Sequence, residues 1–465
     1  MNKLTSHQRK LVYLVGMGLL FIPVITLGFP AAQSRKQAGG VLAQMRQAND
    51  LGESTLGNVD PSSATMNLVL LGLRGPAACM LWVQMDKQKD AKDWAGMRAT
   101  TESIIKLQPH FQKVWQFHAW NLAYNVSVEW DSVKDRYFWV KEGAKFYRKG
   151  SLRNDKYPEL FWYYSDTIGK KIGRSDEWRQ FRRYFRVDPD TERFSPNGVP
   201  GPDTELNPNN EDNYAVSARW FTETNRIMDT YGKEQHIMDK SLFRSYPGRS
   251  MIDHASSLQK EGHFDEETRE IWAKAFLEWK NVYGQETWKP APQIDIHLAW
   301  TKEEIQEFVK NSPLPEGYKG GKKQYEIDLR SWVGRYQNMT NFRYWHDKCY
   351  SEQQKNTVQA HKELYDALAA LASGDTQEAE RLAYTGLQKY EKVIGDAIAG
   401  AGLRDDDLAI EEGMLGIMTW RSALELGNKP IPNDFPLRNM WLAHQNRLKE
   451  IEAEFKRRIS PTRNN

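Results

Sequence analysis

The stretch HKELYDALAALASGDTQEAERLAYTGLQKYEKV, from His361 to Val393, indicates most plainly how this chain folds. It is rich in Lys, Glu, Gln and Leu, and it lacks the alternation of polar and apolar residues that is typical of a strand. One Gly374-Asp375 step divides it, and this pair of residues is a turn signal. The stretch therefore predicts two helices joined by a short turn.

The same composition extends outward from this stretch through most of the chain. Long segments rich in Lys, Glu, Gln, Leu and Trp are separated by Gly- and Pro-containing breaks, two of which lie at Trp288–Asp295 and Asn311–Lys323. Thr301 and Glu304 fit a capping box that begins a helix over Lys302–Val309. The sequence thus predicts an all-α protein.

Composition excludes several functional classes. The 465 residues carry 64 Lys and Arg against 61 Asp and Glu, so the formal charge is only +3, and no nucleic-acid partner is expected. Aromatic residues make up 12% of the chain, enough to build a large core. Two cysteines, Cys79 and Cys349, exclude a disulfide scaffold, a four-cysteine zinc site and an iron–sulfur cluster, although they could form one bridge.

The N-terminus predicts a membrane anchor. No charged residue occurs from Leu11 to Ser34, and the apolar segment Leu11 to Phe29 is long enough to cross a hydrocarbon layer of about 30 Å. A cleaved signal peptide is the alternative, but its apolar core is shorter, and Pro30 lies where a small residue should precede the cleavage site. We expect a single-pass membrane protein whose large C-terminal part is extracytoplasmic, because the N-terminal tail is short.

The breaks divide the chain into six predicted parts. Val187 to Asn213 contains five prolines and almost no large apolar residue, which is typical of a linker or a functional loop. The parts are a short tail at 1–10, the transmembrane anchor at 11–34, a tether at 35–65, a helical domain at 66–186, the Pro-rich linker at 187–213, and a second helical domain at 214–465.

Three stretches resemble tetratricopeptide repeats, which are helix pairs of about 34 residues. Trp115, Ala119 and Leu122 match the packing positions of a first helix, and their spacing places them on one helical face. Ser250–Tyr283 resembles a pair that turns at 261–264. The pair near 361–393 matches through its small residues Ala367, Ala370, Ala379 and Ala383.

The resemblance implies a tetratricopeptide-like, paired-helix array behind the anchor. In that family the first helices line a groove that takes extended peptides. The segments Trp115–Val140 and Thr167–Trp178 also resemble an uncharacterised group of single-span membrane proteins from planctomycete bacteria. That second resemblance implies the same anchored architecture and no activity.

The aromatic-rich stretch from Trp115 to Trp139 contains the favoured functional site. On the repeat frame, Lys113, Gln116 and Trp120 face the groove, with Trp120 as an aromatic anchor for a partner. Packing between helices is the competing interpretation, because aromatic residues at helical spacing are usually core. The sequence therefore favours a non-catalytic, membrane-anchored scaffold that binds a protein partner through this groove.

Two alternatives stay open. Ring faces beside polar groups can bind sugars, so an envelope protein that binds or acts on glycans could use an aromatic cleft formed by Trp162, Tyr164, Asp166 and Trp220. However, the aromatic run at 161–164 spreads its rings around a helix, which favours burial. A purely structural envelope component is the other alternative.

No motif for catalysis, metal binding or a cofactor occurs in the sequence. There is no nucleophile elbow, Walker loop, dinucleotide-binding fingerprint, His-Glu-x-x-His pair or Cys-x-x-Cys. We therefore assign no catalytic or metal-ligating residue and expect no cofactor. No oligomeric state follows from the sequence.

Overall fold

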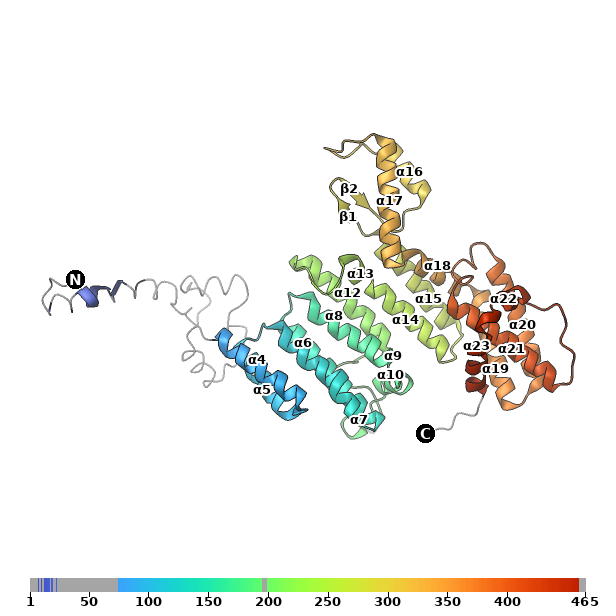
Figure 1. Ribbon diagram of the computed structural model, residues 1–465, viewed down its shortest axis with the longest axis horizontal. Coiled ribbons are helices and arrows are strands. Elements are labelled where there is room, and N and C mark those ends of the chain that lie inside the picture. The colour runs from blue at the N-terminus through green and yellow to red at the C-terminus, as the bar shows by residue number, and fades with distance from the viewer. Residues whose placement is uncertain are drawn as a thin grey trace. The chain divides into compact units, whose positions relative to one another are not determined.

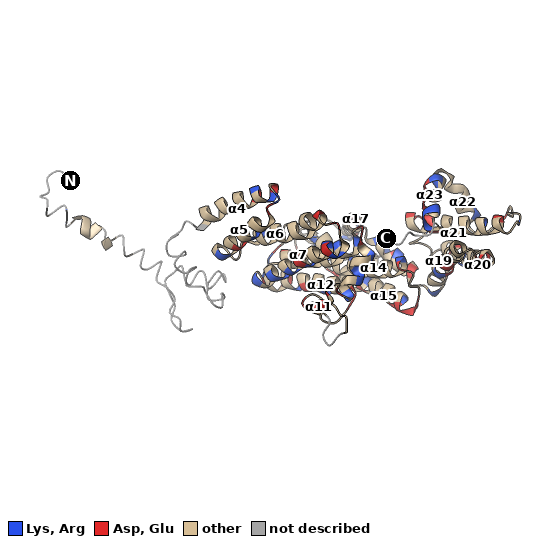
Figure 2. Cartoon of the chain, turned by 90° about the horizontal axis from the view of Figure 1, so that it is seen from below, with Lys and Arg blue, Asp and Glu red and all other residues tan. Residues whose placement is uncertain are grey.

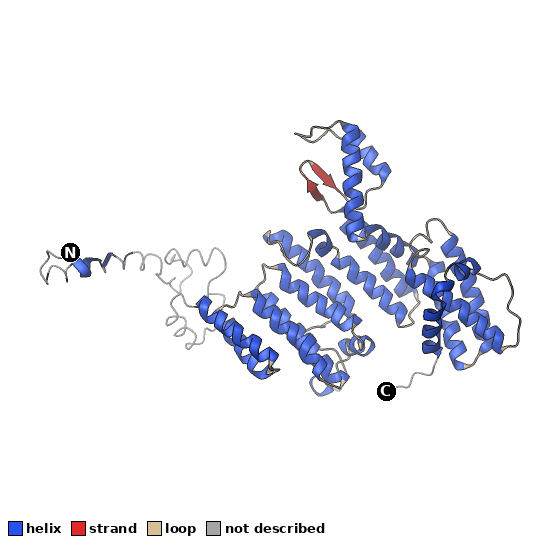
Figure 3. Ribbon diagram, in the orientation of Figure 1, coloured by secondary structure: helices blue, strands red, loops and turns tan. Residues whose placement is uncertain are grey.

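A computed structural model describes residues 74–194 and 199–459, together with ten positions between His7 and Ile22. They form two compact units, one ending at Val114 and the other beginning at Trp115. Most described residues are helical, and neighbouring helices pack in pairs (Figures 1 and 3). The prediction of a mostly α-helical protein with paired helices is confirmed.

The predicted anchor at 11–34 and tether at 35–65 lie for the most part outside the described residues. Within the part of the chain that is described, no helix has both the length and the apolar character needed to cross a bilayer. The membrane span therefore stays a prediction.

The first unit contains the helix pair α4 (Arg74–Asp90) and α5 (Trp94–Leu107). Asp93 caps α5, because its side chain accepts a hydrogen bond from the Gly96 amide at 2.9 Å. Met85 from α4 and Met97 from α5 are fully buried, and the hydroxyl of Thr101 donates to the Met97 carbonyl at 2.8 Å. Apolar burial along one face of each helix thus holds the pair.

The second unit begins with a long helix made of α6 (Gln112–Trp120), the π-helical η2 (Asn121–Val126) and the 3-10 turn η3 (Ser127–Glu129), and α6 starts just before the boundary. It packs on α7 (Val133–Arg153) so closely that a Cβ at Gly143 would lie 2.7 Å from the Ala119 carbonyl oxygen. Trp115, Ala119 and Leu122 are all buried, so the predicted packing face is confirmed.

A row of helices follows α7, each packed on its neighbours (Figure 1). Two of the helices contain π-helical segments, η4 and η6. The row consists of α8 (Pro158–Asp166) with η4 (Thr167–Lys171) and α9 (Ile172–Arg174), α10 (Trp178–Arg186), α12 (Asn213–Tyr231), α13 (Lys240–Arg244), α14 (Tyr246–Lys260), and α15 (Glu266–Leu277) with η6 (Glu278–Val282) and η7 (Tyr283–Gln285). The predicted pair within Ser250–Tyr283 corresponds to α14 and α15, and it turns where expected.

The segment 187–213 packs onto α7. Apart from 195–198, it is described and contains the short helix α11 (Thr191–Phe194). The ammonium of Lys141 in α7 is buried, and it lies 2.7 Å from Asp188 and 3.5 Å from Asp203, one residue from each side of α11. Helices α8 and α12, which flank the segment in sequence, pack against each other through Trp162 and Phe221.

An insertion separates α15 from α18 (Phe342–Glu352) in sequence, although these two helices pack against each other. It consists of an antiparallel pair, β1 (Trp288–Ala291) and β2 (Ile294–Ile296), and the helices α16 (Lys302–Asn311) and α17 (Lys322–Thr340). Thr301 and Glu304 form the predicted capping box of α16. The strand pair lies where the sequence predicted only a break, and it is the only sheet among the described residues (Figure 3).

The C-terminal part contains the helix pair that the sequence indicated most plainly, α19 (Lys355–Ser373) and α20 (Thr376–Gly395). Gly374 ends α19 at φ +88°, and the side chain of Asp375 caps α20. The predicted helix, turn and helix are confirmed. The chain continues through α21 (Asp407–Leu426), α22 (Arg438–Ala443), η8 (Gln445–Arg447) and α23 (Leu448–Ile459), which cover the pair.

Candidate functional site

The long helix that begins with α6 leaves one edge uncovered. Gln116, Trp120, Tyr124 and Val128 follow one another at intervals of four residues and form what we call the α6 stripe. Trp120 is 45% exposed and Val128 is 58% exposed, while Gln116 and Tyr124 are half-buried. The helix therefore packs on α7 with one face and presents a partly apolar edge with another.

Trp120 is supported from within this stripe. Its ring stacks on that of Tyr124, with 5.6 Å between centroids and 18° between planes. The Lys171 ammonium from η4 lies 4.7 Å from the Tyr124 ring centroid, at a distance that allows a cation–π interaction. Burial lowers the pKa of Lys171 and raises the pKa of Tyr124 well above its usual value. An exposed indole thus rests on a second ring that is itself fixed from η4.

The surface continues from the α6 stripe onto α8 and α14. Burial raises the pKa of Tyr163 in α8, although a hydrogen bond with the Gln116 side chain opposes that shift. One turn further, Asp166 pairs with Lys170 at 2.9 Å, and the same ammonium lies 4.5 Å from the ring centroid of Tyr246 in α14. Side chains of three helices therefore join into one aromatic and charged face.

The three residues predicted to face a groove lie together on α6. Lys113 is exposed, three residues before the half-buried Gln116, and Trp120 follows one turn later. The structure adds two members that the sequence argument missed, Tyr124 and Val128. Tyr124 lies four residues and Val128 eight residues after Trp120, and this repeated spacing was the available signal.

A second exposed aromatic group lies where this helix turns into α7. Trp130 and Phe138 are 43% and 39% exposed, and both lie near Trp139, with ring centroids 6.3 Å and 5.3 Å from it. We call these three residues the corner patch. It belongs to the same aromatic-rich stretch of sequence as Trp120, but no functional role was predicted for it.

The residues proposed for a sugar site do not converge on one open cleft. Trp162 and Tyr164 are buried, with 7% and 0% of their surface exposed. Tyr164 packs edge-on against Trp220 at 5.2 Å, whereas Trp162 packs on the other side of α8 with Phe243 and Tyr246. Asp166 is half-buried and pairs with Lys170.

Buried charges form a separate cluster at the junction of α18, α19 and α21. His361 is buried, its Nδ1 lying 2.7 Å from Glu412 and its Nε2 lying 2.9 Å from Glu352. Burial opposes a charged ring, but the two carboxylates outweigh it and raise the pKa of His361 well above 6.5. Burial likewise opposes the Glu352 carboxylate, yet His361 and Lys348 hold its pKa at about 2. The cluster thus holds an imidazolium between two carboxylates.

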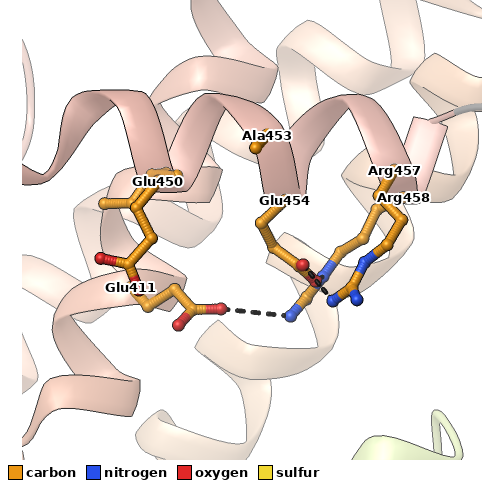
Figure 4. Close-up of a pocket in the computed structure, with 7 residues that line it drawn as sticks. Glu411, Glu450, Ala453, Glu454, Arg457 and Arg458 are labelled. Atoms are coloured by element: carbon orange, nitrogen blue, oxygen red, sulfur yellow. Dashed lines mark hydrogen bonds and ion pairs between the residues drawn. The ribbon is translucent and has the colours of Figure 1, made fainter.

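A pocket of about 380 Å³ lies against α21 and α23. Figure 4 shows that Glu411, Glu454 and Arg458 are joined across it by ion pairs. Because the charged groups that line it already pair with one another, the pocket presents no unsatisfied charge to a ligand. Among the described residues no group of His, Cys, Asp and Glu is arranged to hold a metal ion, and both cysteines are free thiols.

Charges of both signs are interspersed along the helices of the second unit (Figure 2). Many of them pair, as Arg182 does with Asp212 at 2.9 Å and with Glu261 at 2.6 Å. Exposed aromatic rings, rather than a field of one charge, therefore distinguish the α6 stripe. Comparison with known proteins finds no family model, curated protein or solved structure that matches this chain.

Proposed function

We propose that this chain is a membrane-anchored, non-catalytic scaffold whose tetratricopeptide-like helices bind a protein partner along the α6 stripe. The observation that carries the proposal is the 45% exposure of Trp120, stacked on Tyr124. Tryptophan is enriched among the residues that dominate binding energy at protein interfaces. A supported indole that is already oriented loses little conformational entropy when it binds.

The arrangement of polar groups supports a polypeptide partner. The polar side chains of Gln116 and Asp166 lie beside the rings of this surface, where they bond to Tyr163 and Lys170, and Lys171 adds a positive charge. An extended or helical segment lying across α6 and α8 would meet apolar contacts in the middle and polar groups beside them. This combination is typical of protein interfaces.

The glycan alternative has less support. Stacking on a sugar needs an open ring face, and the side chains of Trp162 and Tyr164 are buried in the core. Trp220 is half-buried against Tyr164 and Phe161. We therefore favour the protein-binding scaffold.

Site-specific photocrosslinking in cells that express the full chain tests the proposal. A photoreactive amino acid replaces Trp120, Tyr124 or Val128, and in the control it replaces Tyr365, which lies on α19 and is also 45% exposed. We expect one protein to crosslink at the stripe positions and not at position 365.

A second experiment tests whether the indole of Trp120 contributes to binding of the partner. Affinity capture of the crosslinked partner should fall at least tenfold for Trp120→Ala and stay unchanged for Tyr365→Ala. A partner that crosslinks equally at both sites, or whose capture survives Trp120→Ala, would move the interface away from the stripe. Retention of cell-wall glycan without any protein would favour the alternative.

A further inference from the structure

The loop between α16 and α17 gathers lysines at the far end of the insertion. Lys310 lies in the last turn of α16, Lys319 lies in the loop, and Lys322 and Lys323 begin α17, with Glu316 as the only acidic residue from 310 to 323. We call these four lysines the basic tip, and we propose that it contacts the anionic surface of a lipid bilayer. This interaction is separate from the partner site on α6, and it rests on the membrane anchoring in the proposed function.

No carboxylate forms an ion pair with these ammonium groups within the part of the chain that is described. All four lysines are exposed, and none forms an ion pair there. Elsewhere in the insertion, Lys289 pairs with Asp295 at 3.7 Å and Arg330 pairs with Glu326 at 2.7 Å. The basic tip therefore differs from the mixed charge of the rest of the insertion.

The loop is held in a defined shape. The hydroxyl of Tyr318 donates to Asp328 in α17 at 2.7 Å, and its ring packs edge-on against Tyr325 with 5.0 Å between centroids. The ammonium of Lys322 donates to the carbonyl of Lys310 at 2.8 Å, which links the two ends of the loop. The loop that carries the basic tip thus has a defined shape before any partner arrives.

Two of these lysines also lower the stability of the fold through their position. Lys322 and Lys323 occupy the first turn of α17, where the helix dipole favours acidic residues and disfavours basic ones. By contrast, α15 and α16 each carry two glutamates in their first turns. Lysines that cost stability and form no ion pair among the described residues indicate attraction to something outside the fold.

Two observations favour a bilayer as the anionic partner. The basic tip is presented at a distance, because α17 has 19 residues and, at about 1.5 Å per residue, its first turn lies roughly 27 Å from α18. Half-buried Leu314 and Tyr318 lie between the lysines, and such residues suit the boundary between headgroups and water. The predicted span at 11–34 would keep the chain at a membrane, where several lysines together give appreciable attraction to anionic lipid.

Lysine footprinting of the full chain tests this proposal. The protein is incorporated into nanodiscs of phosphatidylcholine alone or of phosphatidylcholine mixed with phosphatidylglycerol, treated with an amine-reactive reagent and analysed by mass spectrometry. We expect labelling of Lys319, Lys322 and Lys323 to fall at least threefold in the anionic nanodiscs and to recover at high salt. Lys289, which is exposed on β1, should be labelled equally in both.

Matched variants separate the basic tip from general charge. Lys319→Gln with Lys323→Gln should abolish the protection of Lys322, whereas Lys289→Gln with Lys302→Gln removes the same charge from the same insertion and should leave that protection intact. Equal labelling in both nanodiscs would overturn the proposal. So would protection that needs added nucleic acid or an acidic protein.

If the chain does not enter nanodiscs, flotation with vesicles of the same two lipid compositions measures binding of the basic tip to anionic lipid. Salt-sensitive binding to the anionic vesicles alone, lost in the tip variant, would support the proposal, and absence of such binding would refute it. Partner crosslinking at Trp120 gives a separate readout, so failure of one proposal leaves the other intact.

Discussion

The sequence indicated both helix pairs, α6–α7 and α19–α20. The two pairs differ in which side chains they bury and which they leave exposed. In α19–α20, Ala367, Ala379 and Ala383 are fully buried and the connection is capped on both sides. In α6–α7, alanine and glycine allow close backbone contact, while Trp120, Trp130 and Phe138 stay exposed. Small residues build both pairs, but only α6–α7 keeps large rings at its surface.

Both pairs also bury a cation between two carboxylates. Lys141 in α7 contacts Asp188 and Asp203 from the Pro-rich segment, and His361 in α19 contacts Glu352 and Glu412 from flanking helices. Each buried ion pair therefore links neighbouring segments to its helix pair. Both pairs thus combine apolar packing with a buried ion pair to a neighbouring segment.

The largest effect expected is at Lys141. Lys141→Met would leave Asp188 buried without its counter-charge, and breaking a buried pair in this way costs about 3–5 kcal/mol of unfolding free energy. Urea denaturation followed by tryptophan fluorescence measures the loss. The control Lys149→Met removes an exposed lysine from the same helix and should change little. Equal stability of the two variants would show that Lys141 does not fasten the segment.

Substitutions of glycine test how closely the two helices of each pair pack. At Gly143 a new Cβ meets the Ala119 carbonyl oxygen at 2.7 Å, so Gly143→Ala should cost about 1–3 kcal/mol. At Gly386 the nearest atom, 3.0 Å away, is a terminal methyl of the Leu364 side chain rather than backbone, so Gly386→Ala should change stability by less than about 1 kcal/mol. Hydrogen exchange of α7 and α20 peptides reads each effect locally. A larger loss in α20 would reverse the comparison.

The pH dependence of stability distinguishes the two buried cations. Because the pKa of His361 is raised on folding, its contribution is complete below pH 6.5 and is lost as pH rises toward the folded value. This group alone should lower stability by up to about 1.4 kcal/mol per pH unit above pH 7. His361→Gln should flatten that slope in urea denaturation between pH 7 and 9. A slope retained in the variant would assign it to other groups.

Below pH 4.5 the stability contributed by Glu352 changes with pH in the opposite direction, because it decreases as the pH falls. Its pKa is lowered to about 2 on folding, so its contribution is present above its unfolded value and is lost as pH falls toward 2. Glu352→Gln should therefore reduce the acid sensitivity of the α18–α19 junction while lowering its stability at neutral pH. Hydrogen exchange of α19 peptides at pH 3 and pH 6 measures both.

The smallest effect on stability is expected at Trp120. Because the ring is 45% exposed and only stacks on Tyr124, Trp120→Ala should change the free energy of unfolding by less than about 1 kcal/mol. Trp272→Ala, which truncates a fully buried ring in α15, should cost about 3–5 kcal/mol. A comparable loss at Trp120 would indicate a core residue and weaken the scaffold proposal.

Sequence patterns predicted the features that depend on local chemistry. The turn at Gly374-Asp375, the capping box at Thr301 and the buried face of Trp115, Ala119 and Leu122 are all present, because caps, turns and helical periodicity act over a few residues. The sequence could not predict that Trp120 is exposed while Trp162 is buried. Exposure depends on whether another helix covers the helix face that carries the ring.

Long-range ion pairs were also outside what the sequence could predict. Nothing near His361 identifies Glu412, which lies 51 residues away, and nothing near Lys141 identifies Asp188. The strand pair at 288–296 was predicted only as a break, because its strands are short and a Pro lies within β1. Such elements depend on the apolar core that receives them, here Leu329 and Val333 of α17.

The direct packing of α15 on α18 has a consequence for engineering the chain. The indole of Trp279 donates to the Phe342 carbonyl at 2.9 Å, so the chain leaves and re-enters the helical row at nearly the same place. The base of the insertion shares one apolar core with that row, to which Trp288, Ile296 and Leu329 contribute beside Trp279. A fluorescent reporter therefore belongs in an exposed loop of the insertion, away from this core, rather than at the junction.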